Sequence, residues 1–452
     1  MIDTIASLGA ALEAGRTSAA ALTEHALARS ADPAGEGVRV FTRLYGDRAP
    51  GWARASDMLR KDGVVRSPLE GLPISIKDLF DVRGEATLAG SVALDGAPAA
   101  AEHAPVVRRL LAAGAVLVGR TNMTEFAFSG LGLNPHYGTP LNPYDRATGR
   151  IPGGSSSGAA VSVTDGMSVA AIGTDTGGSV RIPAALCGIV GFKPTARRVP
   201  RPGVLPLSTS LDSVGPLAPT VACCAQVDAI LSGSGEGVPA PTPLAGLRLA
   251  VPTTLVMDGA DEAVIEAFAA ALGMLRDAGA QVSEIAVPEF ASLATINAKG
   301  GLAAAEAWHW HRDLIAREGA RYDPRVLVRM LRGKDMSAAD YLDVLEARTA
   351  WVAAVEARLS PFDALLMPTV PVVAPALSPL AADDAAYGVA NALILRNPTL
   401  INFLDGCALS VPCHAPGTAP VGLMIAAPGG ADRRLLSIGQ GIEQTLKTAL
   451  PS

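Results

Sequence analysis

The sequence predicts an α/β fold. Short apolar runs with the length of buried strands alternate with longer segments that have a helical pattern, and glycine turns separate several of them. Hydrophobic residues make up 49% and charged residues 18% of the 452 residues, a balance typical of a chain with a large buried core. Because alternation of this kind brings helices onto the faces of a sheet, we expect helices packed against strands.

In the first half of the chain the elements follow one another closely. Helices are expected at Ile5–Ala14 and Ala19–Arg29, since Ser18 between them has good N-cap chemistry. The apolar run Leu72–Ile76 is typical of a buried strand and places Lys77 at the end of that strand. A helix, a strand and three further segments of the same alternation follow: Val106–Ala113, Ala115–Val118, Ala159–Val163, Val169–Ile172 and Leu186–Val190.

The second half begins after a linker-like stretch rich in Gly, Ser and Pro, Ser232–Pro243, which could separate two domains or be a surface loop within one. A strand (LRLAVP), a helix, a second strand and a long outer helix rich in alanine then follow: Leu247–Pro252, Asp261–Ala278, Gln281–Val287 and Ala338–Leu359. The proline-rich segment Ala364–Pro375 is predicted to be a loop lining the core rather than a central strand.

Composition and charge exclude several classes of function. The net charge is −6, and the short basic group around Arg197 and Arg198 is typical of solvated surface, so no nucleic-acid partner is expected. No run of 18 apolar residues and no signal peptide are apparent, which predicts a cytoplasmic protein without a membrane span. The five cysteines fit reduced core thiols, and the six histidines have no metal-binding spacing, so neither a metal nor a cofactor is expected.

The most informative motif is the run GTDTGGSVRIPAALCGIVGFKPT, from Gly173 to Thr195. In it Ser179 follows two glycines, which allow a sharp turn, and precedes an apolar stretch that could start a helix. The amides of such a turn and the helix N-terminus are oriented hydrogen-bond donors. A serine oxygen placed there can attack a carbonyl while the amides stabilise the oxyanion.

Two other motifs precede this run. PGGSSSG spans Pro152–Gly158, and GLPISIKDLF spans Gly71–Phe80. Alone, the first is typical of a flexible loop, and a lone lysine such as Lys77 would favour a solvated charge over catalysis by roughly ten to one. The joint order of the three pieces reverses those odds. Together they resemble the amidase signature family of serine amide hydrolases.

Other interpretations of these motifs have less support. DTGG (Asp175–Gly178) resembles an aspartic-protease loop, but that site needs a second acidic loop or a dimer in an all-β setting, and no second DTG occurs. Cys187 lies in an apolar run that is typical of a buried, inert thiol. His136 and His414 lack an acidic partner in a recognisable triad motif and are expected in loops.

The resemblance covers nearly the whole chain and implies one amidase signature domain over residues 1–452. Its expected parts are N-terminal helices (1–65), a signature core (66–225) and a C-terminal half that completes the sheet and the substrate pocket (244–452). The family fold implies a single large mixed, mostly parallel β-sheet covered by helices on both faces. One small departure is GGSSSG, where many members carry GGSSGG; position 157 is not expected to take part in the chemistry.

The resemblance also implies the role of each site residue. Ser179 is the expected nucleophile, Ser155 the bridging serine after a cis Gly154–Ser155 peptide bond, and Lys77 the base. A lysine acts as a base only when neutral, which requires burial or nearby positive charge. The backbone amides of Thr176, Gly177 and Gly178, joined by that of Ser179, are the expected oxyanion hole. Ser156, Asp175 and Arg181 are expected in a second layer that holds the two turns together. The expected wall of the substrate pocket is Phe126, Ala127, Phe128 and Ser129.

The expected function is that of a stand-alone amidase, a monomer or homodimer, that opens a C–N acyl bond through an acyl-enzyme on Ser179. Esters and carbamates are chemically adjacent substrates, and some relatives of this size cleave urethanes. The alternative is a glutaminase-like subunit of a tRNA-dependent amidotransferase, against which the absence of a YDGxRYG-like block argues. A non-catalytic scaffold is disfavoured, because all three reacting positions are intact.

Overall fold

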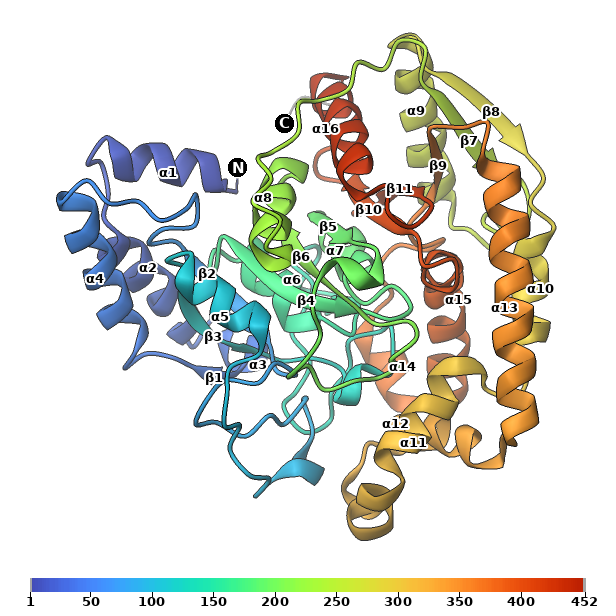
Figure 1. Ribbon diagram of the computed structural model, residues 1–452, viewed down its shortest axis with the longest axis horizontal. Helices are drawn as coiled ribbons and strands as arrows, with labels where there is room; N and C mark the ends of the chain where they lie inside the picture. Colours follow the sequence, from blue (N-terminus) through green and yellow to red (C-terminus); the bar gives the residue numbers. More distant parts are fainter. Residues whose placement is uncertain (1, 450–452) are drawn as a thin grey trace.

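A computed structural model describes residues 2–449, and its strands form one sheet. The strands are β1 (Phe41–Leu44), β2 (Pro73–Lys77), β3 (Val116–Thr121), β4 (Ala170–Asp175), β5 (Val190–Lys193), β6 (Ser213–Ala218), β7 (Arg248–Pro252), β8 (Gln281–Ile285), β9 (Ala364–Pro368), β10 (Cys407–Pro412) and β11 (Gly422–Ala427). Their spatial order is β1-β3-β2-β4-β6-β5-β10-β11-β9-β7-β8 (Figure 1). The predicted α/β class and the single large mixed sheet are therefore confirmed.

The expectation of a mostly parallel sheet is wrong. Of the ten neighbouring strand pairs, four are parallel (β3–β2, β2–β4, β9–β7, β7–β8) and six are antiparallel. β6 returns between β4 and β5 and runs against both, and β10 and β11 run against each other and against their outer neighbours β5 and β9. Antiparallel strands need no crossover helix. The connections β5–β6 and β10–β11 carry no α-helix, so helix–strand alternation in the sequence does not extend to these strands.

Helices cover both faces of this sheet. They are α1 (Ile5–Glu13), α2 (Ala19–Ala31), α3 (Gly37–Val40), α4 (Ala49–Lys61), α5 (Pro105–Ala112), α6 (Ser157–Thr164), α7 (Arg181–Cys187), α8 (Val221–Ser232), α9 (Glu262–Asp277), α10 (Glu289–Ile296), α11 (Gly301–Glu318), α12 (Pro324–Leu331), α13 (Ala338–Leu359), α14 (Leu377–Ala382), α15 (Asp384–Phe403) and α16 (Asp432–Ala449). Alternate residues of a strand serve the two layers: Leu409 of β10 packs in the cluster that includes α5, α8 and α16, whereas Ala408 packs with α13 and α15.

Most expected elements are present, and α13 has the predicted bounds Ala338–Leu359. The expectation for Ala364–Pro375 is wrong, because Ala364–Pro368 forms β9, a fully buried strand between β11 and β7. Proline disfavours a strand only where its missing N–H is needed. Here Pro368 ends the strand, and Pro371 and Pro375 follow it.

The linker-like stretch Ser232–Pro243 connects the end of α8 to β7 without helix or strand beyond Ser232. Strands from both sides of it are hydrogen-bonded in the same sheet, since β10 of the second half pairs with β5 of the first. The linker therefore does not separate two sheets. Within residues 2–449, no helix has the length and apolar character needed to cross a membrane.

Candidate active site

Three chain segments meet at one edge of the sheet. Lys77 ends β2 and Asp175 ends β4, and the two strands are parallel, so their carboxyl ends lie together. The turn that carries Ser155 precedes α6, which leads away from this edge and back into β4. The turn that carries Ser179 follows β4 directly and leads into α7. The topology therefore brings together the three residues that the sequence nominated.

Lys77 is completely buried and contacts two hydroxyl groups. Its Nζ donates to Ser155 Oγ at 2.7 Å and to Thr174 Oγ1 at 2.8 Å. Burial lowers the pKa of the Lys77 amine to about 7, because the charged form is poorly solvated, while the negative charges of Asp212 and Asp175 act in the opposite direction. A lysine with this pKa is partly neutral near pH 7 and can accept a proton.

Backbone hydrogen bonds to a neighbouring segment fix the turn that carries Ser155. The Gly154–Ser155 peptide bond is cis, as the resemblance implied. The Gly154 amide donates to Gly130 O at 2.7 Å, and the Ser155 carbonyl accepts from the Thr124 amide at 3.1 Å. The two serine turns are joined by the Ser156 amide, which donates to the Ser179 carbonyl at 3.2 Å. No hydrogen bond joins Ser155 Oγ and Ser179 Oγ in the described chain, although both side chains are buried.

Asp175 and Arg181 form a buried ion pair that holds the nucleophile turn, at 2.9 Å between Arg181 Nη2 and Asp175 Oδ1. The Asp175 carboxylate also accepts from the backbone amides of Gly178 (2.8 Å) and Val180 (3.1 Å). Burial alone would raise the pKa of Asp175, but the charge and hydrogen bond of Arg181, together with the charge of Lys193, lower it well below its ordinary value. The pair thus keeps the turn closed around Ser179.

The sequence analysis missed Asn402 of α15, which completes this network. Its side-chain amide donates to Asp175 Oδ1 at 2.9 Å, and its Oδ1 accepts from Arg181 Nη2 at 2.6 Å. Asn402 lies 227 residues from Asp175 in the chain, so no local pattern around Asp175 pointed to it.

The backbone donors differ in one respect from the expected oxyanion hole. The Gly178 amide is already bonded to Asp175 Oδ1, so it is not an open donor. The amides of Thr176, Gly177 and Ser179 have no acceptor among the described residues. Three of the four amides named from the sequence are therefore available, and the fourth stabilises the turn.

Asp212 is a second residue that the sequence analysis did not name. Its Oδ1 accepts from Thr176 Oγ1 at 2.5 Å, and its carboxylate also accepts from the amides of Leu207 and Ser208. Burial raises the pKa of Asp212 to about 6, although these hydrogen bonds oppose the shift. Asp212 lies within the expected signature core (66–225), but none of the three motifs includes it.

The four residues expected in the substrate-pocket wall have different surroundings. Phe126 is 1% exposed and its ring lies 4.4 Å from His311 and 5.0 Å from Tyr322, so it packs in the core. Its backbone and that of Ala127 have φ of 50° and 61°, in the left-handed region, which turns the segment inward. Ser129 Oγ donates to Asn391 Oδ1 at 2.8 Å. Phe128 is the half-buried member of the four.

An arginine from the second half reaches this wall. Arg329 of α12 donates to the Phe128 carbonyl at 2.6 Å and lies 5.5 Å from the centre of the Tyr387 ring. It has no ion-pair partner among residues 2–449, and the buried Tyr387 hydroxyl has no hydrogen-bond partner there either. Arg329 is thus a half-buried cation that lies over the Tyr387 ring and is fixed to the backbone of the expected pocket wall.

Another buried set superficially resembles a catalytic triad. Glu125 Oε1 accepts from Ser91 Oγ at 2.6 Å and contacts His136 Nε2 at 2.9 Å, a partner that the sequence did not reveal. Here the carboxylate lies between the serine and the histidine, whereas a triad needs the histidine in the middle to take the serine proton. Cys187 is buried, and burial raises the pKa of its thiol, which fits the predicted inert thiol.

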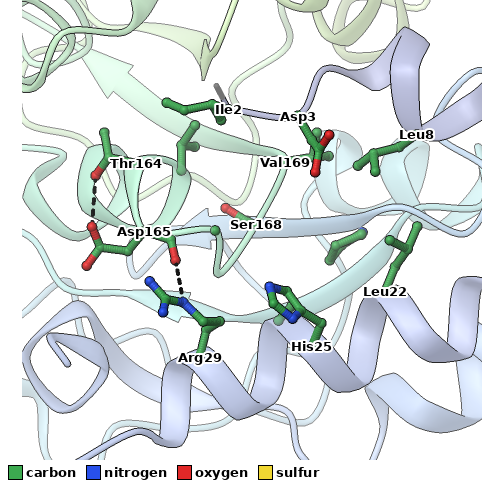
Figure 2. Close-up of a pocket in the computed structure, with 14 residues that line it drawn as sticks. Ile2, Asp3, Leu8, Leu22, His25, Arg29, Thr164, Asp165, Ser168 and Val169 are labelled. Carbon is green, nitrogen blue, oxygen red and sulfur yellow. Dashed lines mark hydrogen bonds between the residues drawn. The ribbon is translucent and has the colours of Figure 1, made fainter. Parts of the chain in front are cut away.

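The cleft of about 510 Å³ in Figure 2 lies at the opposite edge of the sheet. It is lined by Pro73, the first residue of β2, by Val169 just before β4, and by residues of α1 and α2 such as His25 and Arg29. Pro73 and Lys77 are four steps apart along β2, or about 13 Å at about 3.3 Å per step. This cleft therefore does not open onto Ser179.

The chain has relatives among known proteins along nearly its whole length. The profile of the family described as Amidase matches residues 21–436. The chain is 40% identical to the 2-amino-5-chloromuconic acid deaminase of Comamonas testosteroni over 402 residues, covering 88% of this chain and 86% of the relative. It is 35% identical to a glutamyl-tRNA(Gln) amidotransferase subunit of Chloroflexus aggregans, covering 98% and 96%. A crystal structure of an amidase has a TM-score of 0.87 at 33% identity, covering 98% of this chain and 99% of that one.

Proposed function

This chain belongs to the amidase signature family of enzymes that hydrolyse C–N bonds, and from that premise we propose that it cleaves a small amide through an acyl-enzyme on Ser179. The observation that carries the proposal is the hydrogen bond from the buried Lys77 Nζ to Ser155 Oγ, beside the turn that holds Ser179. No cofactor is needed for this chemistry, because the serine, the amine and the backbone amides supply the nucleophile, the base and the oxyanion donors.

The reaction begins with neutral Lys77. It accepts the Ser155 hydroxyl proton, Ser155 takes the proton of Ser179, and Ser179 Oγ forms a bond to the substrate carbonyl carbon. The carbonyl π electrons move to oxygen, and the amides of Thr176, Gly177 and Ser179 stabilise that charge, at about 3 kcal/mol per donor. Collapse breaks the C–N bond, and the leaving nitrogen receives the proton back through Ser155. Water then cleaves the ester by the same route and restores Ser179.

The substrate class follows from the wall of the site. Arg329, which has no ion-pair partner among the described residues and donates to the Phe128 carbonyl of the expected pocket wall, favours an amide that carries a carboxylate. The deaminase of Comamonas testosteroni acts, by its name, on an organic acid. Carbamates and esters remain within the proposal, because their acyl carbons meet the same nucleophile and oxyanion donors.

A second candidate function is that of a glutaminase-like component of a tRNA-dependent amidotransferase. The full-length similarity to such components favours it. The two functions differ in what the chain does alone, since a component of a complex depends on its partners. Turnover by the isolated chain therefore discriminates between them.

The first prediction tests the function with a panel of substrates. We expect the isolated chain to hydrolyse at least one of an aliphatic amide, an aryl amide, a dicarbonyl amide carrying a carboxylate and an aryl carbamate, with the acidic amide giving the lowest KM. Activity should survive EDTA. Released amine or ammonia is the measurement. No turnover without partner proteins would favour the amidotransferase alternative, and loss on chelation that zinc restores would contradict the serine mechanism.

The second prediction concerns Ser155, which bridges Lys77 and the nucleophile. Ser155→Ala should lower the acylation rate by about 10²–10⁴-fold with little change in KM, because a proton relay is lost while the binding surface stays. Pre-steady-state acylation is the measurement. Ser157→Ala, the neighbouring serine outside the relay, is the control. Near-normal acylation in Ser155→Ala would leave a simpler dyad of Ser179 and Lys77.

A further inference from the structure

An apolar groove of about 320 Å³ lies between α10 and α15, beside the nucleophile turn. Its walls include Phe290 and Leu293 from α10, Leu395 and Leu400 from α15, and Leu255 from the loop after β7. Residues of both helices therefore face the same groove. A groove of this size and character can hold a ring or a branched alkyl group.

The groove touches the catalytic turn through one face of α15. Thr399 Oγ1 donates to the Gly177 carbonyl at 3.4 Å. A Cβ added at Gly177 would lie 3.2 Å from Thr399 Oγ1 and 3.6 Å from Leu395 Cδ2. Leu395 and Thr399 are four residues apart, so they share a helix face, and both line the groove.

The exposure of its residues distinguishes one position in the nucleophile turn. In the turn from Thr176 to Val180, only Gly177 is half-buried, and the other residues are buried. Leu395 and Thr399 are half-buried as well. Leu395 and Thr399 thus lie beside the one residue of this turn that is not fully buried.

The charge at the rim restricts what the groove accepts. Arg396 donates to the carbonyls of Asp258 (2.5 Å) and Val256 (3.0 Å) and has no ion-pair partner among residues 2–449. The guanidinium is thus held in place, and its positive charge disfavours a cationic group next to it, while the charge of Asp258 acts on it from further away. The remaining surface is mostly alkyl and aromatic carbon.

We infer that this groove binds an uncharged apolar substituent, aryl or branched alkyl, of the amide that Ser179 attacks. The inference rests on the proposed function and extends it. A substituent seated against Phe290 and Leu395 gains apolar burial, and it keeps the acyl carbon beside the Gly177 amide and Ser179. On this inference, the natural substrate is an amide that carries an aryl or branched alkyl substituent.

The test fills the groove from either wall. Ala294 on α10 and Ala392 on α15 are exposed residues that line it, so Ala294→Phe and Ala392→Phe each place a ring in its space. Two substrate pairs are compared: propionamide with 4-phenylbutyramide, and acetamide with acetanilide. In at least one pair, each variant should lower the preference for the aryl member, as the ratio of kcat/KM values, by about tenfold or more. The pair that responds identifies the side of the scissile bond.

The control is Ser292→Phe, on the same helix but outside the groove, which should leave both ratios unchanged. Circular dichroism checks that each variant is folded. Because the two variants lie on separate helices, the test remains valid if one of them misfolds. Unchanged ratios in both folded variants would overturn the inference. If the parent enzyme neither hydrolyses any of the four amides nor is labelled at Ser179 by a fluorophosphonate probe, the proposed function itself fails, so the two failures are distinguishable.

Discussion

Replacing Ser179 with alanine is expected to lower kcat/KM by about 10⁴–10⁶-fold while the protein stays folded. The change removes the only atom that bonds to the substrate carbonyl carbon in the proposed reaction. It leaves the turn intact, because Asp175 holds that turn through the amides of Gly178 and Val180 rather than through the serine side chain. Steady-state rates and the melting temperature are the measurements.

Covalent labelling gives an independent check of the same residue. A fluorophosphonate should modify Ser179 in the parent protein and fail to modify Ser179→Ala. Cys187 is the competing nucleophile, and burial holds its thiol in the protonated, inert form. Labelling of Cys187, or of no residue at all, would contradict the assignment of Ser179 as the nucleophile.

Lys77→Met is expected to lower kcat/KM by at least about 10⁴-fold, since no other base among residues 2–449 contacts Ser155 Oγ. In the parent enzyme, the pKa of about 7 predicts how the rate depends on pH. Below pH 7 the amine is protonated and cannot accept a proton, so kcat/KM should fall about tenfold for each pH unit. Above pH 7 the amine is neutral and kcat/KM should reach a plateau. The measurement is kcat/KM over a pH range that extends about two units to either side of that pKa.

A matched control comes from the other buried lysine, Lys193 of β5. It donates to the carbonyls of Pro194 and Gly406 and contacts neither serine. Lys193→Met should lower the melting temperature, because it leaves these acceptors without a donor, but should keep an acidic limb near pH 7. A parent profile that is flat across pH 7, or an acidic limb that survives in Lys77→Met, would exclude Lys77 as the base.

Much of the fold could be predicted because its signals are local. The alternating apolar runs identified β2, β4 and α9, and the pattern of Ala338–Leu359 predicted α13 to the residue. Proline misled the prediction at β9, since the residue type does not reveal whether its missing N–H faces a partner strand. Strand direction was also beyond local signals, because nothing in β6 itself indicates that it inserts between β4 and β5.

For the candidate site, the sequence by itself determined the chemical types and their order: a strand ending in Lys77, a serine turn with Ser155, and a glycine turn before Ser179. Turn formation and serine reactivity depend on neighbours in the chain, so the local sequence around each residue indicates them. Resemblance to the family then assigned their roles.

Only the tertiary structure decided the rest. Asn402 reaches Asp175 across 227 residues of chain, Asp212 bonds to Thr176, and the Gly178 amide is taken up by Asp175. Burial lowers the pKa of Lys77, and Thr399 of α15, which lines the apolar groove, contacts the Gly177 carbonyl. Desolvation and long-range contacts depend on which elements the topology packs together, and that information does not reside in any one segment of the sequence.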